Sequence, residues 1–167
     1  YKTHIIPLLN KLTPLSEQTG SVNTIYKKKN EIIGDNTDVG GFSAALKHIH
    51  YNVKDKKAFI LGAGGVTPSI ISALKKMGIK NIVLSNRTKE KSQILKEKFG
   101  DIELINWGET INSDIIINAT SLGLKEKDEI KIDYSKIGSN KLFYDVVYNP
   151  STTKFLLKAQ KLNNQIE

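Results

Sequence analysis

Short apolar runs alternate with helix-like segments from residue 56 onward, and this alternation constrains the fold more than any other feature. The runs lie at 58–61, 82–84, 114–117 and 142–147. Segments between them, such as 68–77 and 89–99, carry apolar residues at helical spacing and are followed by glycines. Strands that are apolar throughout are buried on both faces, which is typical of a parallel sheet covered by helices. The pattern therefore predicts an α/β fold.

Helices are also predicted in two places outside this alternation near the start of the chain, and in one at its end. Residues 4–12 carry apolar residues at helical spacing, with Pro7 early enough to lie in a first turn. A second helix is predicted to open at Gly40-Gly41. The last is predicted over 151–162, with Ser151 as its N-cap.

A lysine run near the start separates two strand-like segments, 21–26 and 31–37. The run, residues 27–30, is therefore predicted to be the tip of a hairpin. The chain has a net charge of +8, but only one of its 25 basic residues, Arg87, is an arginine. Because dispersed lysines are typical of a solvated surface and the planar arginine fork favours phosphate and base recognition, we do not expect nucleic-acid binding.

The composition excludes several further classes of protein. The chain has no cysteine, which rules out disulfides, thiolate metal ligands and cysteine nucleophiles. No apolar run approaches the ~18–20 residues of a membrane span, and the first residues lack the pattern of a signal peptide. The three histidines lack neighbours suited to a metal, so no metal site is predicted. A cytoplasmic protein that binds no membrane is the expectation.

A glycine-rich loop directly follows the first apolar run and precedes the helix predicted over 68–77. Its sequence is Gly62-Ala63-Gly64-Gly65-Val66. Glycines at this point allow a tight turn and let a pyrophosphate approach the N-terminus of the helix. A tight strand-to-helix turn without a ligand is the alternative. Because a strand precedes, a helix follows and a second strand ends about 20 residues later, dinucleotide binding on a Rossmann-type doubly wound sheet is favoured.

The end of the second apolar run indicates which dinucleotide would bind. A site that prefers NAD carries an Asp or Glu there for the ribose hydroxyls, whereas this chain has Asn86-Arg87-Thr88. Arg87 is suited to hold an adenosine 2′-phosphate, with the hydroxyl of Thr88 as a further donor. A surface arginine at the start of a helix is the alternative. The interpretation favoured by these residues is NADP(H).

Six strings of residues, in order, resemble the shikimate dehydrogenase family. They are 20–24 (GSVNT), 34–38 (GDNTD), 62–65 (GAGG), 86–88 (NRT), 118–121 (NATS) and 144–150 (YDVVYNP). The resemblance implies NADPH-dependent, reversible reduction of 3-dehydroshikimate to shikimate in the biosynthesis of aromatic amino acids. It also implies a small-molecule substrate; a homodimer is one open alternative for the assembly, which the sequence does not decide. The family has further segments before and after the part that this chain resembles, so truncation at both ends is expected.

The resemblance assigns site residues position by position. Lys2 and Asp38 are the implied catalytic pair, and Asn23 and Tyr148 join them as implied substrate contacts. By residue type alone, Lys2 is an ordinary terminal lysine and Asp38 a turn or cap residue. The expected cofactor-binding residues are Gly62, Ala63, Gly64, Gly65, Val66, Asn86, Arg87, Thr88, Lys91, Thr120, Ser121 and Val146.

The domain organisation follows from the same resemblance. Residues 1–41 are the expected end of a smaller α/β substrate-binding domain, 42–55 a connecting helix and 56–167 the NADP-binding Rossmann-type domain. Two alternatives stay open. One is a quinate/shikimate dehydrogenase with relaxed cofactor use, and the other is a domain that binds NADP without catalysis. Thr67, Pro68 and Ser69 stand where the family often carries a basic residue.

Overall fold

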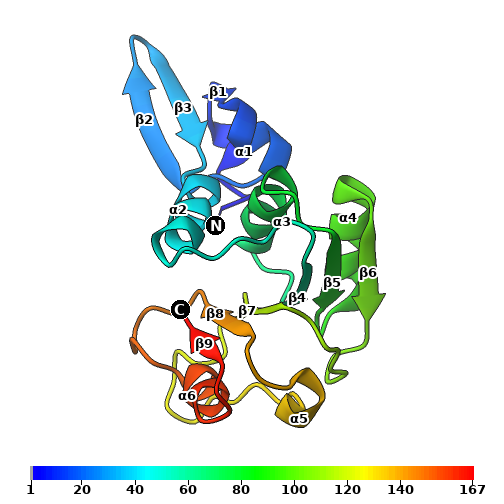
Figure 1. The fold of residues 1–167 in the computed structure, drawn as a ribbon. Coiled ribbons are helices and arrows are strands. Elements are labelled where there is room, and N and C mark those ends of the chain that lie inside the picture. Colours follow the sequence, from blue (N-terminus) through cyan, green and yellow to red (C-terminus); the bar gives the residue numbers. More distant parts are fainter. Residues whose placement is uncertain (1) are drawn as a thin grey trace. The chain divides into compact units, whose positions relative to one another are not determined.

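The computed structural model describes residues 2–167, whose contacts group them into two units (Figure 1). The first unit contains the described residues up to Lys54 together with Gly65–Gly78. The second contains Asp55–Gly64 and Ile79–Glu167. The division passes through the glycine loop. The two units are defined by contacts within the chain and say nothing about which ligand each one binds. The substrate-binding and NADP-binding domains expected from the sequence therefore remain a prediction.

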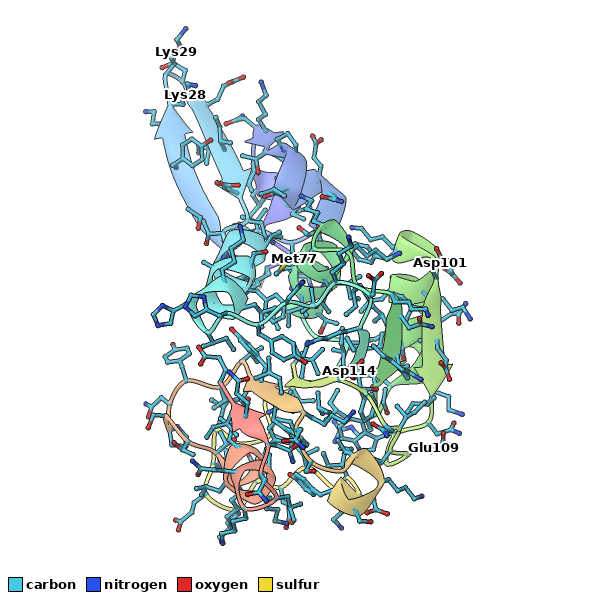
Figure 2. The ribbon with its side chains drawn as sticks, viewed as in Figure 1. Lys28, Lys29, Met77, Asp101, Glu109 and Asp114 are labelled. Carbon is cyan, nitrogen blue, oxygen red and sulfur yellow. The ribbon has the colours of Figure 1, made fainter. Side chains whose placement is uncertain are left out.

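The first unit contains a small sheet with strand order β1-β3-β2. Strand β2 is antiparallel to β3, and Lys28 and Lys29 lie at the tip of this hairpin (Figure 2), which confirms the predicted hairpin. Strand β1 runs parallel to β3. The elements are η1 (Ile6–Leu8), β1 (Lys11–Leu12), α1 (Pro14–Thr19), β2 (Thr24–Lys28), β3 (Glu31–Asp35), α2 (Asp38–His48) and α3 (Thr67–Lys76).

The helix predicted over residues 4–12 is wrong beyond the short 3₁₀ turn η1. Asn10 pairs with β3 instead: its backbone N–H donates to the Ile32 carbonyl (3.0 Å), and its side-chain Oδ1 accepts from the Ile32 N–H (2.8 Å). Strand β1 follows directly. These residues therefore bond to a strand distant in the chain rather than to their own next turn, and tertiary pairing overrides the helical spacing.

The second unit contains a parallel sheet with strand order β6-β5-β4-β7-β8-β9. Numbered within this unit, the order is 3-2-1-4-5-6, that of the doubly wound dinucleotide-binding fold. The fold class predicted from the sequence is confirmed. The elements are β4 (Lys57–Leu61), β5 (Asn81–Ser85), α4 (Lys89–Phe99), β6 (Ile102–Ile105), β7 (Ile115–Asn118), α5 (Tyr134–Ile137), β8 (Leu142–Asp145), α6 (Lys154–Gln160) and β9 (Gln165–Ile166).

Aromatic side chains hold the last part of the second unit together. The ring of Phe143 on β8 is fully buried, stacks on Tyr134 at 5.7 Å between centroids and packs on Phe155 at 5.3 Å. Helix α6 begins after Thr153, whose Oγ1 accepts from the Leu156 N–H at 3.4 Å. The prediction of Ser151 as this cap is wrong, because Thr153 is buried and also bonded within the unit, whereas Ser151 is exposed.

Every helix formed by residues 2–167 is too short or too polar to cross a lipid bilayer.

Candidate functional site

Lys2 and Asp38 form an ion pair in the first unit, with 2.5 Å between Lys2 Nζ and Asp38 Oδ2. Asp38 is the first residue of α2, where the backbone N–H groups and the helix dipole favour a carboxylate. The exposed fractions of the two side chains are 36% for Lys2 and 24% for Asp38. Both are therefore held by each other and still reachable from solvent, as a proton-transferring pair must be.

Asn23 engages the second carboxylate oxygen of Asp38. Its Nδ2 donates to Asp38 Oδ1 at 2.7 Å, and its Oδ1 accepts from the Thr37 N–H at 3.0 Å. Both oxygens of Asp38 therefore have a side-chain donor. The structure brings together Lys2, Asn23 and Asp38, three residues that the sequence assigned to one site.

A hollow of about 490 Å³ lies beside this cluster in the first unit. Its walls are mostly apolar, and Lys2 and Asn23 supply polar groups. Apolar walls with a few polar groups, at a volume of a few hundred Å³, are typical of small-molecule sites. The lining residues are Lys2, His4, Ile5, Leu8, Val22, Asn23 and Ile25.

Gly65, in the second half of the glycine loop, lies against the Lys2 side chain. A Cβ added at Gly65 would be 3.5 Å from Lys2 Cδ, and the Gly65 carbonyl accepts from Ser21 Oγ at 2.9 Å. Val66 follows as the residue before α3 and offers no side-chain cap. The backbone that opens α3 is thus placed next to the catalytic candidate within one unit.

The first half of the glycine loop belongs to the second unit and is tied to the end of β5. The Gly62 N–H donates to the Ser85 carbonyl (2.8 Å), and the Ala63 N–H donates to Asn86 Oδ1 (3.0 Å). Asn86 also donates from Nδ2 to the Thr88 carbonyl (2.7 Å). Asn86 therefore sets the loop geometry with its side chain.

Gly62 is required by both its backbone and its neighbours. Its φ is +103°, and a Cβ would lie 2.8 Å from the Ala119 carbonyl oxygen. Ala119 follows β7, the neighbour of β4 at the point where the strand order reverses. Ligands of doubly wound folds bind at this switch point. A Cβ added at Gly64 would lie 3.6 Å from the Ala119 carbonyl oxygen, an ordinary van der Waals contact, so this position has room for a side chain.

Replacing Gly62 by alanine is expected to lower the free energy of unfolding by about 2 kcal/mol, the scale of backbone strain at a positive φ. Urea unfolding without cofactor measures this. Gly64→Ala is the matched control and is expected to change the stability by less than about 0.5 kcal/mol, as at an unstrained position. Equal losses in both variants would contradict the assignment of strain to Gly62.

Arg87, Thr88 and Lys91 are exposed where β5 ends and α4 begins. Over residues 2–167, no carboxylate forms an ion pair with Arg87, so its guanidinium can take an anionic ligand. A second hollow, of about 520 Å³, opens beside Asn86 and Lys89 and extends to Asn106. Of the predicted cofactor residues at this strand end, Asn86 lines the hollow, whereas Arg87, Thr88 and Lys91 lie on the exposed surface outside its lining.

Asn118 and Asp145 join the loops that follow β7 and β8, a link that sequence reasoning missed. Asn118 donates from Nδ2 to Asp145 Oδ1 (2.8 Å) and accepts at Oδ1 from the Thr120 N–H (3.0 Å). Thr153 Oγ1 donates to Asp145 Oδ2 (2.6 Å), and the Val147 N–H to Oδ1 (2.9 Å). The signal was available: a carboxylate and an amide each end a strand that is otherwise apolar.

This link orders the backbone around three predicted cofactor residues, Thr120, Ser121 and Val146, which are half-buried or exposed. Tyr148, a predicted substrate contact, is on the same segment as Val146 and is 90% exposed. Tyr148 belongs to the second unit, whereas Lys2, Asn23 and Asp38 belong to the first. Its role therefore stays a prediction.

Burial raises the pKa of Asp145, although bonds from Thr153, Val147 and Asn118 act in the opposite direction. An acid with a raised pKa in the folded state stabilises the fold at low pH and loses that contribution as the pH rises. The stability of the wild type relative to Asp145→Asn is therefore expected to fall as the pH rises above about 4, the ordinary pKa of aspartate. Urea unfolding at several pH values measures this.

Asp133 is a control of opposite sign, because the hydrogen bond from the Ser135 hydroxyl lowers its pKa. The stability of the wild type relative to Asp133→Asn is expected to rise with pH from the acid range. Curves of the same sign for both substitutions would contradict the burial argument for Asp145.

Sequence comparison identifies relatives along nearly the whole chain. A model of the family described as Shikimate / quinate 5-dehydrogenase matches residues 44–146. The chain is similar to the shikimate dehydrogenase (NADP(+)) of Pelagibacter ubique, with 59% identity over 161 residues, which cover 96% of this chain and 61% of the relative. The chain thus spans about three fifths of that relative's length.

Solved structures share the fold over the same extent. Shikimate 5-dehydrogenase from Thermus thermophilus, in complex with NADP(H) and shikimate, aligns with a TM-score of 0.88 at 28% identity, covering 99% of this chain and 62% of that one. Quinate dehydrogenase from Corynebacterium glutamicum, in complex with NAD, aligns with a TM-score of 0.87 at 25% identity. The alignment covers 99% of this chain and 63% of that one.

Proposed function

The chain belongs to the shikimate / quinate 5-dehydrogenase family, and from this premise we propose that the protein is an NADP-dependent shikimate dehydrogenase. It would reduce 3-dehydroshikimate reversibly to shikimate with NADPH. The observation that carries the proposal is the Lys2–Asp38 pair, joined by Asn23, with Lys2 and Asn23 supplying polar groups to a hollow of small-molecule size. The Pelagibacter relative, a shikimate dehydrogenase (NADP(+)), supports the same substrate and cofactor.

The proposed roles of the side chains follow from the chemistry of ketone reduction. When bound, the nicotinamide supplies the hydride, so the protein must supply orientation and a proton. Lys2 donates that proton to the oxygen of the substrate during reduction and accepts it during oxidation. Asp38 holds the Lys2 ammonium through Oδ2. Asn23 lines the same hollow, and a substrate hydroxyl or carboxylate would take the place of Thr37 Oγ1 on its Nδ2 while the bond to Asp38 is kept.

The proposed cofactor contacts lie at the ends of β4, β5, β7 and β8. Gly62 to Val66 would receive the pyrophosphate at the opening of α3, where backbone N–H groups favour an anion. Arg87, with Thr88 and Lys91, would bind the 2′-phosphate, which NAD lacks. Thr120, Ser121 and Val146 would border the nicotinamide, since ligands of this fold lie beyond the carboxyl ends of the strands.

Quinate oxidation is the second candidate, favoured by the similarity to the Corynebacterium quinate dehydrogenase bound to NAD. The strand end that would meet the NAD ribose carries Arg87 and no carboxylate, which supports NADP and shikimate as the first choice. A protein that binds NADP without catalysis would have no use for the Lys2–Asp38 pair. A homodimer and a cytoplasmic location complete the proposal as predictions.

The test is an absorbance assay of nicotinamide reduction on the complete gene product. Shikimate and quinate are each offered with NADP and with NAD, and kcat/KM is compared across the four pairs. We expect the highest value for shikimate with NADP. A preference for quinate with NAD would establish the second candidate, and NADP binding without any turnover would refute both dehydrogenase assignments.

A further inference from the structure

Asn36 is buried beside the proposed catalytic pair and touches no ligand-facing surface. It is 1% exposed. Its side-chain Oδ1 accepts from the backbone N–H groups of Asp38 (3.1 Å) and Val39 (3.4 Å), the first two residues of α2. Thr37, the residue at the N-cap position, offers no side-chain cap. Asn36 is therefore the side chain that caps α2, and it explains why this helix begins at Asp38 rather than at the predicted Gly40.

The other end of the Asn36 amide binds three acceptors in the first unit. Its Nδ2 donates to Thr19 Oγ1 (3.1 Å), to the Ser21 carbonyl (2.9 Å) and to Ser69 Oγ (2.9 Å). The Ser69 hydroxyl is also within 3.2 Å of Asn36 Oδ1 and is fully buried. Ser69 lies in the first turn of α3, which directly follows the glycine loop.

Asp38 thus has an anchor on each side. On the exposed side, Lys2 and Asn23 bond its two carboxylate oxygens. On the buried side, Asn36 holds its backbone. An aspartate side chain has two torsions, so a fixed backbone at Asp38 leaves little freedom to the carboxylate once both oxygens are bonded. Positioning to within about 0.5 Å is what proton-transfer sites require.

We infer that Asn36 is a positioning residue for Asp38, and that Ser69 extends this positioning to the start of α3. The inference deepens the proposed function and rests on it. A site residue held through a buried network keeps its geometry without touching the substrate itself. Asn36 would therefore influence turnover strongly and cofactor affinity weakly.

The test compares two serines of one helix, together with Asn36. Ser69→Ala removes a hydroxyl bonded to Asn36. Ser72→Ala is the matched control, because the buried Ser72 hydroxyl has no hydrogen-bond partner among the residues described. We expect kcat for shikimate oxidation to fall about fivefold in Ser69→Ala, the range of one lost buried hydrogen bond. It should fall roughly tenfold or more in Asn36→Ala, which also loses the bonds to the Asp38 and Val39 N–H groups. The KM for NADP should stay within about twofold in all three, as for a residue that makes no ligand contact.

A double-mutant cycle separates positioning from a general structural role. In an Asp38→Asn background, the Ser69→Ala and Asn36→Ala substitutions should cost less than about twofold, because the group they position is already disabled. The same fold-loss in both backgrounds, or a Ser72→Ala variant as impaired as Ser69→Ala, would overturn the inference.

Backbone amide exchange supplies a readout that does not need turnover. Exchange at Asp38 and Val39 should accelerate in Asn36→Ala and Ser69→Ala and stay unchanged in Ser72→Ala. Unchanged exchange at Asp38 in both of the first two variants would refute the positioning role. A wild-type protein without turnover would refute the proposed function instead. In that case the amide exchange rates at Asp38 and Val39 would still show whether Asn36 positions Asp38.

Discussion

Replacing Asp38 by asparagine is expected to lower kcat of the complete gene product by ~10²-fold or more, and Lys2→Ala by a similar factor, the scale of general acid–base assistance. The reason lies in the 2.5 Å contact between Lys2 Nζ and Asp38 Oδ2. Without the carboxylate the ammonium loses its orientation, and without the amine the proton has no donor. Steady-state kinetics in both directions measure kcat, and fluorescence titration measures NADPH affinity, which should barely change.

A second lysine–carboxylate pair of this chain serves as the control. Lys158 and Glu129 are hydrogen-bonded in the second unit, and the side chains are about half exposed. An exposed pair of this kind contributes little to stability and none of the expected catalysis. Lys158→Ala and Glu129→Gln should therefore retain wild-type turnover. Turnover retained in Asp38→Asn or Lys2→Ala would remove the proton-transfer roles.

Replacing Arg87 by alanine is expected to lower kcat/KM for NADPH by about 10²-fold, the loss of a charge-assisted, two-pronged contact with a phosphate. The kcat/KM for NADH, which has no 2′-phosphate, should change by less than about threefold, as for a position that NADH does not contact. Arg87 is the only arginine of the chain, and it is exposed at the end of β5. The measurement is the ratio of kcat/KM for the two cofactors.

Lys96→Ala is the control for net charge, since Lys96 is an exposed cation in the last turn of α4. It should leave the cofactor ratio unchanged. An Arg87→Ala variant with equal losses for both cofactors would show that the guanidinium does not discriminate between them, and the NADP assignment would then depend on the relatives alone.

Much of the second unit could be predicted because its signals are local. Apolar runs such as 58–61 are buried on both faces, and the predicted helix over Lys89–Phe99 has these bounds in the structure. The predictions failed where the local structure depends on a hydrogen-bond partner that is distant in the sequence. Residues 10–12 pair with β3 instead of extending a helix, and Thr153, not Ser151, caps α6 because its hydroxyl also reaches Asp145. Local propensity carries no information about either partner.

The sequence by itself determined the parallel sheet, the turn at the glycines and the residue types of the candidate site, since hydrophobic period and backbone sterics act between near neighbours. The resemblance paired Lys2 with Asp38, but only the tertiary structure decided that their side chains meet across 36 positions. It alone also decided that Asn23 bonds the Asp38 carboxylate and that Asn36 bonds the Asp38 backbone N–H. The physical reason is that a buried donor or acceptor must find its partner wherever the folded chain supplies one.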